Sequence, residues 1–167
     1  MYYTGIGSRE TPKDVLANMD HIAQILAIKG YTLRSGHAIG ADRAFEHGCD
    51  FRKGKKQIWN PNGVFYPLHE WATDHASSVC YEYPLEKMKG YTIKIITRNM
   101  YQIFGDHPTD QIPSDFVVYW CKGDPIKKGN DSGGTRYAVR IAHKNNIPHF
   151  NLRTQTSEFK EFLKKLK

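Results

Sequence analysis

Small and polar residues that could bind an anion gather in the stretch 34–42, which reads Arg-Ser-Gly-His-Ala-Ile-Gly-Ala-Asp. Gly36 and Gly40 permit backbone conformations and close approaches that larger side chains block. A helix is predicted to follow at once, and the first turn of a helix has N–H groups with no partner inside the helix. Such donors bind phosphates and other anions. An ordinary tight turn between a strand and a helix would explain the same stretch, so the choice depends on other loops.

Two other predicted loops have the same character. One contains Gly5, Gly7, Ser8 and Arg9, and the other runs from Gly129 to Thr135. In a parallel sheet such loops meet at the carboxyl edge of the strands, where ligands bind. The three loops together therefore predict a phosphate site. Its candidate residues are Gly7, Ser8, Arg9, Ser35, Gly36, His37, Gly40, Ala41, Asp42, Ser132, Gly133, Gly134 and Thr135. Asp42 is expected to fix its own loop by accepting hydrogen bonds from backbone N–H groups.

The elements that position these loops alternate between strands and helices. Strands are predicted at 2–7, 31–35, 55–60, 115–121 and 147–152. Helices are predicted from the Thr11 cap to Gly30, at 41–51, around 69–79, at 91–104, from 135 to 146 and at 157–166. This alternation indicates an α/β fold with right-handed crossovers. We expect one Rossmann-like domain over 1–167, a doubly wound, mostly parallel sheet with helices on both faces.

Composition limits the kinds of partner. The 167 residues carry a formal charge of +7 and a pI near 9.3, which favours nucleotides and nucleic acids. No apolar run could span a bilayer and no signal peptide is evident, so we expect a cytoplasmic protein without a membrane partner. The three cysteines lie far apart, which predicts buried thiols.

Two kinds of cofactor chemistry are disfavoured. The histidines lack the spacing of metal ligands, so no metal is predicted. The position three residues beyond Gly7 is Glu10, which breaks the dinucleotide fingerprint, so no cofactor is predicted either. Oligomeric state stays open, with a homo-oligomer as one alternative.

The three loops, with Ile147-Pro148 before the last strand, resemble the Smf/DprA and LOG (SLOG) superfamily of Rossmann-like nucleotide-binding domains. The resemblance covers roughly residues 2–152 and is closest to compact DprA-like members. His37 stands where that superfamily usually has glycine. Thr97-Arg98-Asn99-Met100 resembles a family helix with an Arg-Asn pair. The resemblance implies that Arg98 reaches a ligand phosphate and Asn99 its sugar or base. A compact domain is also the form expected of phage-encoded relatives.

The resemblance leaves three functions open. LOG-type phosphoribohydrolases cleave the N-glycosidic bond of nucleoside monophosphates, but the position of their glutamate is Ala138 here, which argues against this activity. DprA-like members bind single-stranded DNA, for which Arg9, Arg34, Arg43, Arg98 and Arg136 would supply phosphate contacts. Tyr66, Trp71 and Tyr101 would then supply stacking. A third function is the sensing or sequestering of a nucleotide signal, such as an ADP-ribose derivative. Binding of a nucleotide or nucleic-acid phosphate is common to all three.

Overall fold

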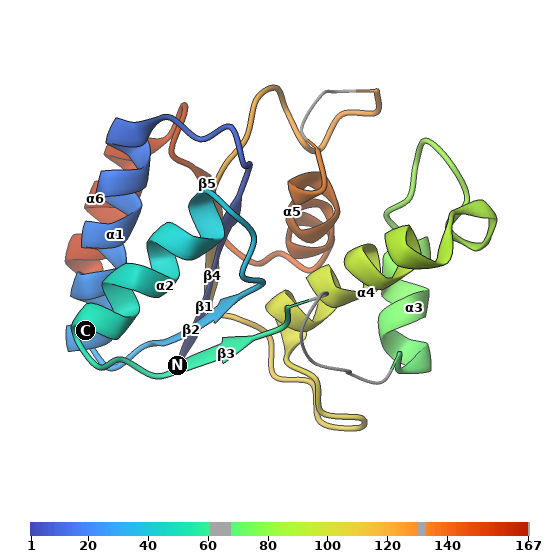
Figure 1. Ribbon diagram of the computed structural model, residues 1–167, viewed down its shortest axis with the longest axis horizontal. Helices are drawn as coiled ribbons and strands as arrows, with labels where there is room; N and C mark the ends of the chain where they lie inside the picture. Colours follow the sequence, from blue (N-terminus) through green and yellow to red (C-terminus); the bar gives the residue numbers. More distant parts are fainter. Residues whose placement is uncertain (61–67, 130–132, 167) are drawn as a thin grey trace.

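Five parallel strands form one sheet in the order β3-β2-β1-β4-β5 (Figure 1). The computed structural model describes residues 1–60, 68–129 and 133–166. Its strands are β1 (Tyr2–Gly7), β2 (Thr32–Ser35), β3 (Lys56–Ile58), β4 (Phe116–Trp120) and β5 (His149–Asn151). The sheet confirms the predicted doubly wound α/β fold, and all of its strand pairs are parallel rather than most of them.

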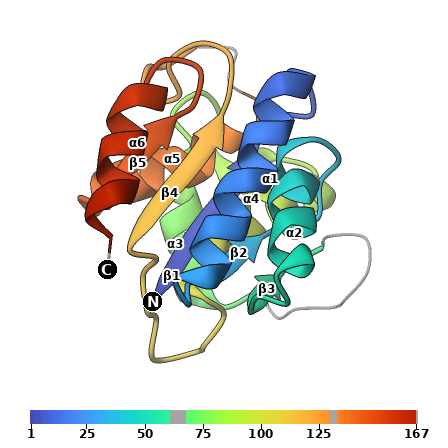
Figure 2. The same ribbon diagram turned by 90° about the vertical axis from the view of Figure 1, so that its left-hand side faces the viewer.

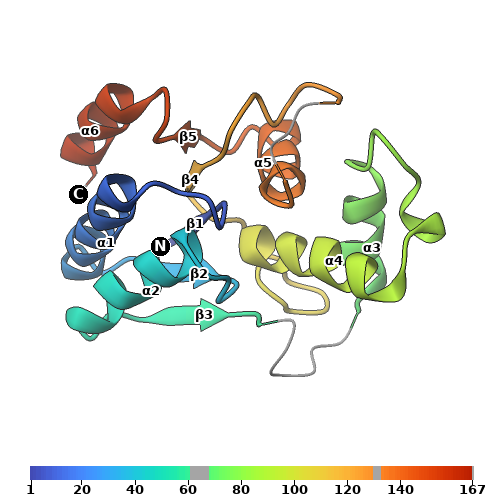
Figure 3. The same cartoon turned by 45° about the horizontal axis from the view of Figure 1, so that its top comes forward.

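Helices cover both faces of the sheet (Figure 3). One face is covered by α1 (Lys13–Ile28), α2 (Ala41–Phe51) and α6 (Thr156–Lys165), which Figure 2 shows in front of the strands. The other face is covered by α3 (Glu70–Ser77), the short 3-10 helix η1 (Leu85–Lys87), α4 (Gly90–Phe104) and α5 (Thr135–Lys144). No helix in these described ranges is both long enough and apolar enough to cross a membrane.

The two hydrophobic cores follow from the alternation of side chains along the central strands. On β4, Phe116 and Val118 pack with the α1, α2 and α6 side, whereas Val117 and Tyr119 pack with the α3, α4 and α5 side. All five residues of β4 are buried, as the continuous apolar run predicts for a strand covered on both faces. The site described below depends on this rigid centre.

Helix ends agree with the sequence except at the first helix. Gly30 and Gly105 follow α1 and α4 with φ angles of 80° and 76°, as expected for glycines that end helices. The prediction that Thr11 caps α1 is wrong, because Pro12 occupies the cap position in an extended conformation and no side chain caps the helix. The Thr11 hydroxyl instead donates to the Ser8 carbonyl, 2.7 Å away, and so fixes the loop after β1.

Candidate functional site

A cavity of about 700 Å³ opens at the carboxyl ends of β1 and β2, next to α4 and the starts of α2 and α5. This position matches the point where the chain crosses to opposite faces of the sheet, where ligands of such folds bind. Most of the candidate residues line it: Gly7, Ser8, Arg9, Gly36, His37, Asp42, Arg98, Asn99, Gly133, Gly134 and Thr135. The structure therefore brings the three predicted loops and the Arg-Asn pair together around one space.

Three other candidate residues, Ser35, Gly40 and Ala41, do not line this cavity. The Ser35 hydroxyl is buried and donates to the Gly5 carbonyl at 2.7 Å. Gly40 has a φ of 95°, and a Cβ there would lie 2.7 Å from the Ser8 carbonyl oxygen, so glycine is required. Ala41 is fully buried. These residues shape the floor, and Ser132 lies outside the described residues.

Asp42 holds two of the loops together. Its carboxylate accepts hydrogen bonds from the backbone N–H groups of Gly7 (3.2 Å), Gly36 (3.2 Å) and Ala38 (3.4 Å). Burial raises the pKa of this carboxyl to about 6, although Arg98 and the backbone donors act in the opposite direction. The expected role of Asp42 in fixing its loop is confirmed by these contacts.

Backbone N–H groups at the start of α2 already have hydrogen-bond acceptors within the protein. The N–H of Ala41 donates to the Ser8 carbonyl at 3.5 Å, and the N–H of Arg43 donates to the Ala38 carbonyl at 3.3 Å. Asp42 accepts from other backbone N–H groups of the same loops. Most of the N–H groups that we predicted to bind an anion are therefore already hydrogen-bonded within the protein. The loop 35–42 is thus a braced wall of the cavity rather than its main set of backbone donors.

Arg98 and Asn99, on α4, connect the loop after β2 with the start of α5. Arg98 donates from Nη1 to the Gly36 carbonyl at 2.9 Å and from Nη2 to Asn99 Oδ1 at 3.1 Å. Asn99 in turn donates from Nδ2 to the Gly134 carbonyl at 3.0 Å. The pair therefore positions both neighbouring loops while it lines the cavity.

Two buried donors beside this chain of contacts have no partner among the described residues. They are Arg98 Nε and Gln102 Nε2, on side chains that line the cavity from α4. Both residues approach Gly36 so closely that a Cβ there would collide with the Arg98 guanidinium and lie 2.5 Å from Gln102 Nε2. Buried donors of this kind cost free energy unless an acceptor reaches them.

The start of α5 differs from the start of α2. Gly134 occupies the cap position, and in the described part of the chain no side chain caps the helix. Gly133 has a φ of 58°, and a Cβ added to Gly133 or Gly134 would meet nothing within 4 Å. Gly133, Gly134 and Thr135, at the start of α5, line the cavity.

A buried ion pair fixes α5 from behind. Arg140, fully buried, donates from Nη1 and Nη2 to Glu82 at 2.9 and 2.6 Å. It also donates to the carbonyls of Val79, Pro125 and Lys127. The Arg140 guanidinium and a backbone N–H lower the pKa of Glu82 to about 2. These contacts hold the segment that leads from β4 toward the start of α5.

His37 has a conformation that glycine favours. Its φ is 61°, in the left-handed region where glycine is favoured. Its Nδ1 lies 2.6 Å from Glu46 Oε2, and Glu46 is buried on α2. Sequence analysis did not predict this pair, because only the turn at Gly40 brings the two side chains together.

Several residues proposed for DNA contacts are internal. Arg34 is buried and donates to the carbonyls of Ile103 and Ile112 and to Gln57, so its expected phosphate contact is corrected. Tyr101 is fully buried and offers no open stacking surface. Trp71 is partly buried and packs against Tyr101. Arg136 lies 4.0 Å from Glu82 Oε2, and Tyr66 falls outside the described residues.

The helical spacing of α4 contained a signal that sequence analysis missed. Tyr91, Ile95, Arg98 and Gln102 lie on one stripe of the helix, and all line the cavity. Only Arg98 and its neighbour Asn99 were singled out, because the others resemble ordinary core or surface positions. A search along the same stripe from Arg98 would have found Gln102.

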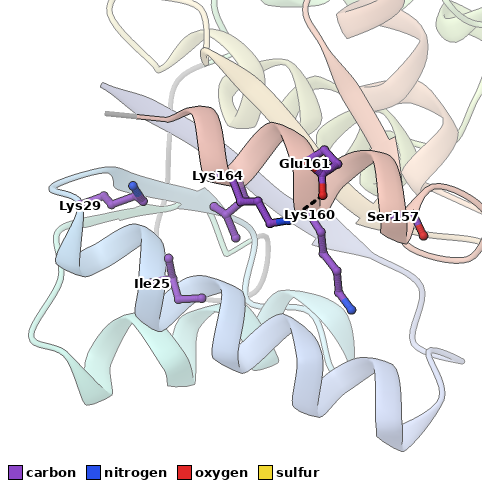
Figure 4. A pocket seen from close by; sticks show the side chains of 7 residues that line it. Ile25, Lys29, Ser157, Lys160, Glu161 and Lys164 are labelled. Atoms are coloured by element: carbon purple, nitrogen blue, oxygen red, sulfur yellow. Dashed lines mark hydrogen bonds and ion pairs between the residues drawn. The ribbon is translucent and has the colours of Figure 1, made fainter.

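A second hollow of about 520 Å³ lies between α1 and α6 on the far side of the sheet (Figure 4). Two of its three lysines are engaged locally: Lys164 pairs with Glu161 at 2.7 Å, and Lys29 donates to the Leu166 carbonyl at 2.7 Å. Ile25 and Leu163 supply apolar surface. No buried side chain in the described ranges points an unpartnered polar atom into it.

Comparisons with known proteins add no assignment to this geometry. No family model matches the chain, and no curated protein matches it.

Proposed function

We propose that this protein binds a nucleotide through its phosphate in the cavity at the carboxyl ends of β1 and β2. The observation that carries the proposal is a pair of buried donors, Arg98 Nε and Gln102 Nε2, which have no partner among the described residues and belong to side chains that line the cavity. An acceptor from the ligand would satisfy both donors, and a phosphate also neutralises the arginine charge. The SLOG resemblance of the loops supports the same ligand class.

The phosphate would lie between Arg98 and the first turn of α5. Gly133 and Gly134 leave the backbone there accessible, and the helix dipole favours an anion at that end. Arg9 and Arg43 line the same cavity from exposed positions and add positive charge at its rim. The volume of about 700 Å³ is in the range of small-molecule sites.

The base and sugar would extend along α4. Tyr91 and Ile95 line the cavity on the stripe that also bears Arg98, and the exposed Ile39 faces the cavity from the loop after β2. Aromatic and aliphatic side chains of this kind accept the face of a base. Asn99 would contact the sugar or the base while it holds the Gly134 carbonyl.

The two other functions have weaker support. Ala138 is fully buried in the core and does not line the cavity, so position 138 provides no carboxylate for N-glycosidic hydrolysis. Single-stranded DNA would find Arg9 and Arg43 at the rim, but Arg34 and Tyr101 are internal. A nucleotide or nucleotide signal therefore fits better than a DNA strand.

A thermal-shift panel tests the proposal, because a ligand that binds only the folded state raises its melting temperature. The probes are AMP, ADP, ADP-ribose and an oligothymidylate, with chromatography to detect any released base. At least one nucleotide is expected to raise the melting temperature by several degrees. No shift with any of the four would contradict the proposal, and a shift with the oligonucleotide alone would favour DNA binding.

The substitution Gln102→Leu tests whether the unpartnered side-chain amide of Gln102 binds the nucleotide. It removes a buried donor without a partner, so the unliganded protein should be as stable as the wild type or more stable. The nucleotide-induced shift should fall by at least half. Gln24→Leu, on α1 at the opposite face of the sheet, is the matched control and should leave the shift unchanged.

Arg43 and Arg52 give a second matched pair, because both are exposed arginines at opposite ends of α2. Arg43→Ala should weaken nucleotide binding by about 5- to 10-fold, as expected for loss of an exposed charge near the ligand. Arg52→Ala makes the same change in net charge away from the cavity. Equal effects of the two variants would exclude a local role for Arg43.

A further inference from the structure

The contact between His37 and Glu46 gives the cavity a group that can accept a proton. Glu46 Oε2 lies 2.6 Å from His37 Nδ1, and the side chain of Glu46 is only 7% exposed. A carboxylate only accepts hydrogen bonds, so the proton of a neutral imidazole is assigned to Nδ1. Nε2 is then the basic nitrogen, on a side chain that is 41% exposed and lines the cavity.

The pair is built at some cost to the fold. His37 adopts a left-handed backbone conformation at φ 61°, which is unfavourable for a residue other than glycine or asparagine. Glu46 is buried, and its second oxygen, Oε1, has no partner among the residues that the structure describes. Neither feature is needed to brace the loop, because Asp42 and Arg98 already hold Gly36.

His37 lines the same cavity as the donors proposed for the phosphate. Gly36, its neighbour in the chain, accepts from Arg98 Nη1 and lies beside Gln102 Nε2. A phosphate on Arg98 Nε and Gln102 Nε2 would therefore lie beside the residue that precedes His37. Asp42, the other carboxylate of the same wall, is buried and accepts from three backbone N–H groups, so it is not placed to activate a water molecule in the cavity.

We propose that His37 is the general base for hydrolysis of a diphosphate-bridged nucleotide bound in this cavity, with Glu46 as the residue that positions its imidazole. This inference rests on the proposed nucleotide binding. His37 Nε2 takes a proton from a water molecule as the water oxygen forms a bond to one phosphorus. The bridging P–O bond breaks, and the second phosphate departs with the electron pair of that bond.

The charges around the cavity select this class of bond. Arg9, Arg43 and Arg98 can neutralise the negative charge that develops on the phosphoryl oxygens, but arginine does not give up a proton. A leaving group that needs no proton is therefore favoured, and a phosphate of a diphosphate bridge meets this condition better than an alkoxide. For ADP-ribose and water the products are AMP and ribose 5-phosphate.

The experiment follows AMP release from ADP-ribose by chromatography, using the full chain, and measures ADP-ribose binding by calorimetry. His37→Asn is the main variant, because asparagine tolerates the left-handed conformation and its amide can still donate to Glu46. It should retain the affinity for ADP-ribose within about threefold and lose turnover by at least 100-fold. His37→Gly with added imidazole should recover part of the turnover.

Glu46→Gln tests the positioning role, since it keeps an acceptor beside Nδ1 and removes the charge. It should lower kcat by about 10-fold with KM unchanged, where kcat is expressed per ADP-ribose-binding site counted by calorimetry, so that any unfolded protein does not contribute. Binding of ADP-ribose without turnover by the wild type would overturn the inference and leave nucleotide binding intact. Equal turnover by His37→Asn and the wild type would also overturn it. Absence of ADP-ribose binding would overturn this inference too, whereas the proposed nucleotide binding would fall only if AMP and ADP also failed to bind.

Discussion

The starts of α2 and α5 face the same cavity, and the protein treats them in opposite ways. At α2, the Asp42 carboxylate and nearby carbonyls engage the backbone donors of the loop, so the wall is closed upon itself. At α5, Gly133 and Gly134 leave the helix start uncapped by any described side chain, and a buried ion pair stabilises the segment from behind. The backbone donors at the start of α2 are hydrogen-bonded within the protein, and we call this the closed wall. The start of α5 has no cap from a described side chain, and we call it the open wall.

This difference shows where an anion is expected to bind. A helix start provides an anion site only when its N–H groups are not already used. The loop 35–42 has the small residues of such a site, yet its donors serve the fold. At the start of α5 no described side chain caps the helix, and a Cβ added to Gly133 or Gly134 would meet no described atom within 4 Å. Arg98 and Asn99 link the two, so a ligand at α5 also contacts the braced wall.

The largest expected effect comes from breaking the closed wall. Asp42→Ala leaves the N–H groups of Gly7, Gly36 and Ala38 without their acceptor, and we expect it to lower the free energy of unfolding by about 3 to 5 kcal/mol. Thr135→Ala at the open wall should cost about 1 kcal/mol or less. Urea denaturation measures both values, and equal losses would contradict the contrast between the walls.

The two walls should also respond to pH in opposite directions. Burial raises the pKa of Asp42 to about 6, so the folded protein binds a proton that the unfolded chain does not bind between about pH 4 and 6. Stability from this group is present below its unfolded pKa of 3.8 and is lost as the pH rises through 6. The contribution is about 3 kcal/mol.

Glu82, behind the open wall, has a pKa lowered to about 2 by Arg140. Its stabilisation is present above the unfolded pKa of 4.5 and is lost as the pH falls toward 2, by about 2 to 3 kcal/mol. Denaturation from pH 7 to 2 measures both terms. Asp42→Asn should remove the gain between pH 7 and 4, and Glu82→Gln should remove the loss below pH 4.5. Unchanged profiles would show that these two groups do not control the pH dependence.

Much of the frame was predictable from local patterns. Some features depend only on residues within or next to one element, so they can be recognised from the sequence. They are the apolar run of β4, the helical spacing of α1 and α4, and the glycines at 30 and 105. The convergence of three loops followed from the topology of parallel sheets. Asp42 was also assigned its role correctly, because its acceptors and their donors are close in sequence or at adjacent strand ends.

Contacts between distant residues could not be predicted. Arg34 was expected to contact phosphate, but it binds carbonyls of Ile103 and Ile112 that the fold brings to it. Arg140 and Glu82 form their pair across separate helices and loops. No local pattern distinguishes such a buried arginine from an exposed one. The same limit hid the contact of His37 with Glu46 and the unpartnered amide of Gln102.

The most direct test of the open wall places a negative charge at the start of α5. Gly134→Asp is sterically allowed, since a Cβ at this position meets nothing within 4 Å. An aspartate there should cap the helix and leave the melting temperature unchanged or higher. It should also repel a phosphate from the same donors. Gly134→Asn, which caps without charge, is the matched control.

Calorimetric titration of these two variants and the wild type with AMP, or with whichever nucleotide the thermal-shift panel finds to bind best, decides the question. We expect Gly134→Asp to weaken binding by about 100-fold, or about 2.7 kcal/mol, and Gly134→Asn to have a smaller effect. Wild-type affinity in a folded Gly134→Asp protein would contradict phosphate binding at the start of α5, because an anion held there could not tolerate that carboxylate.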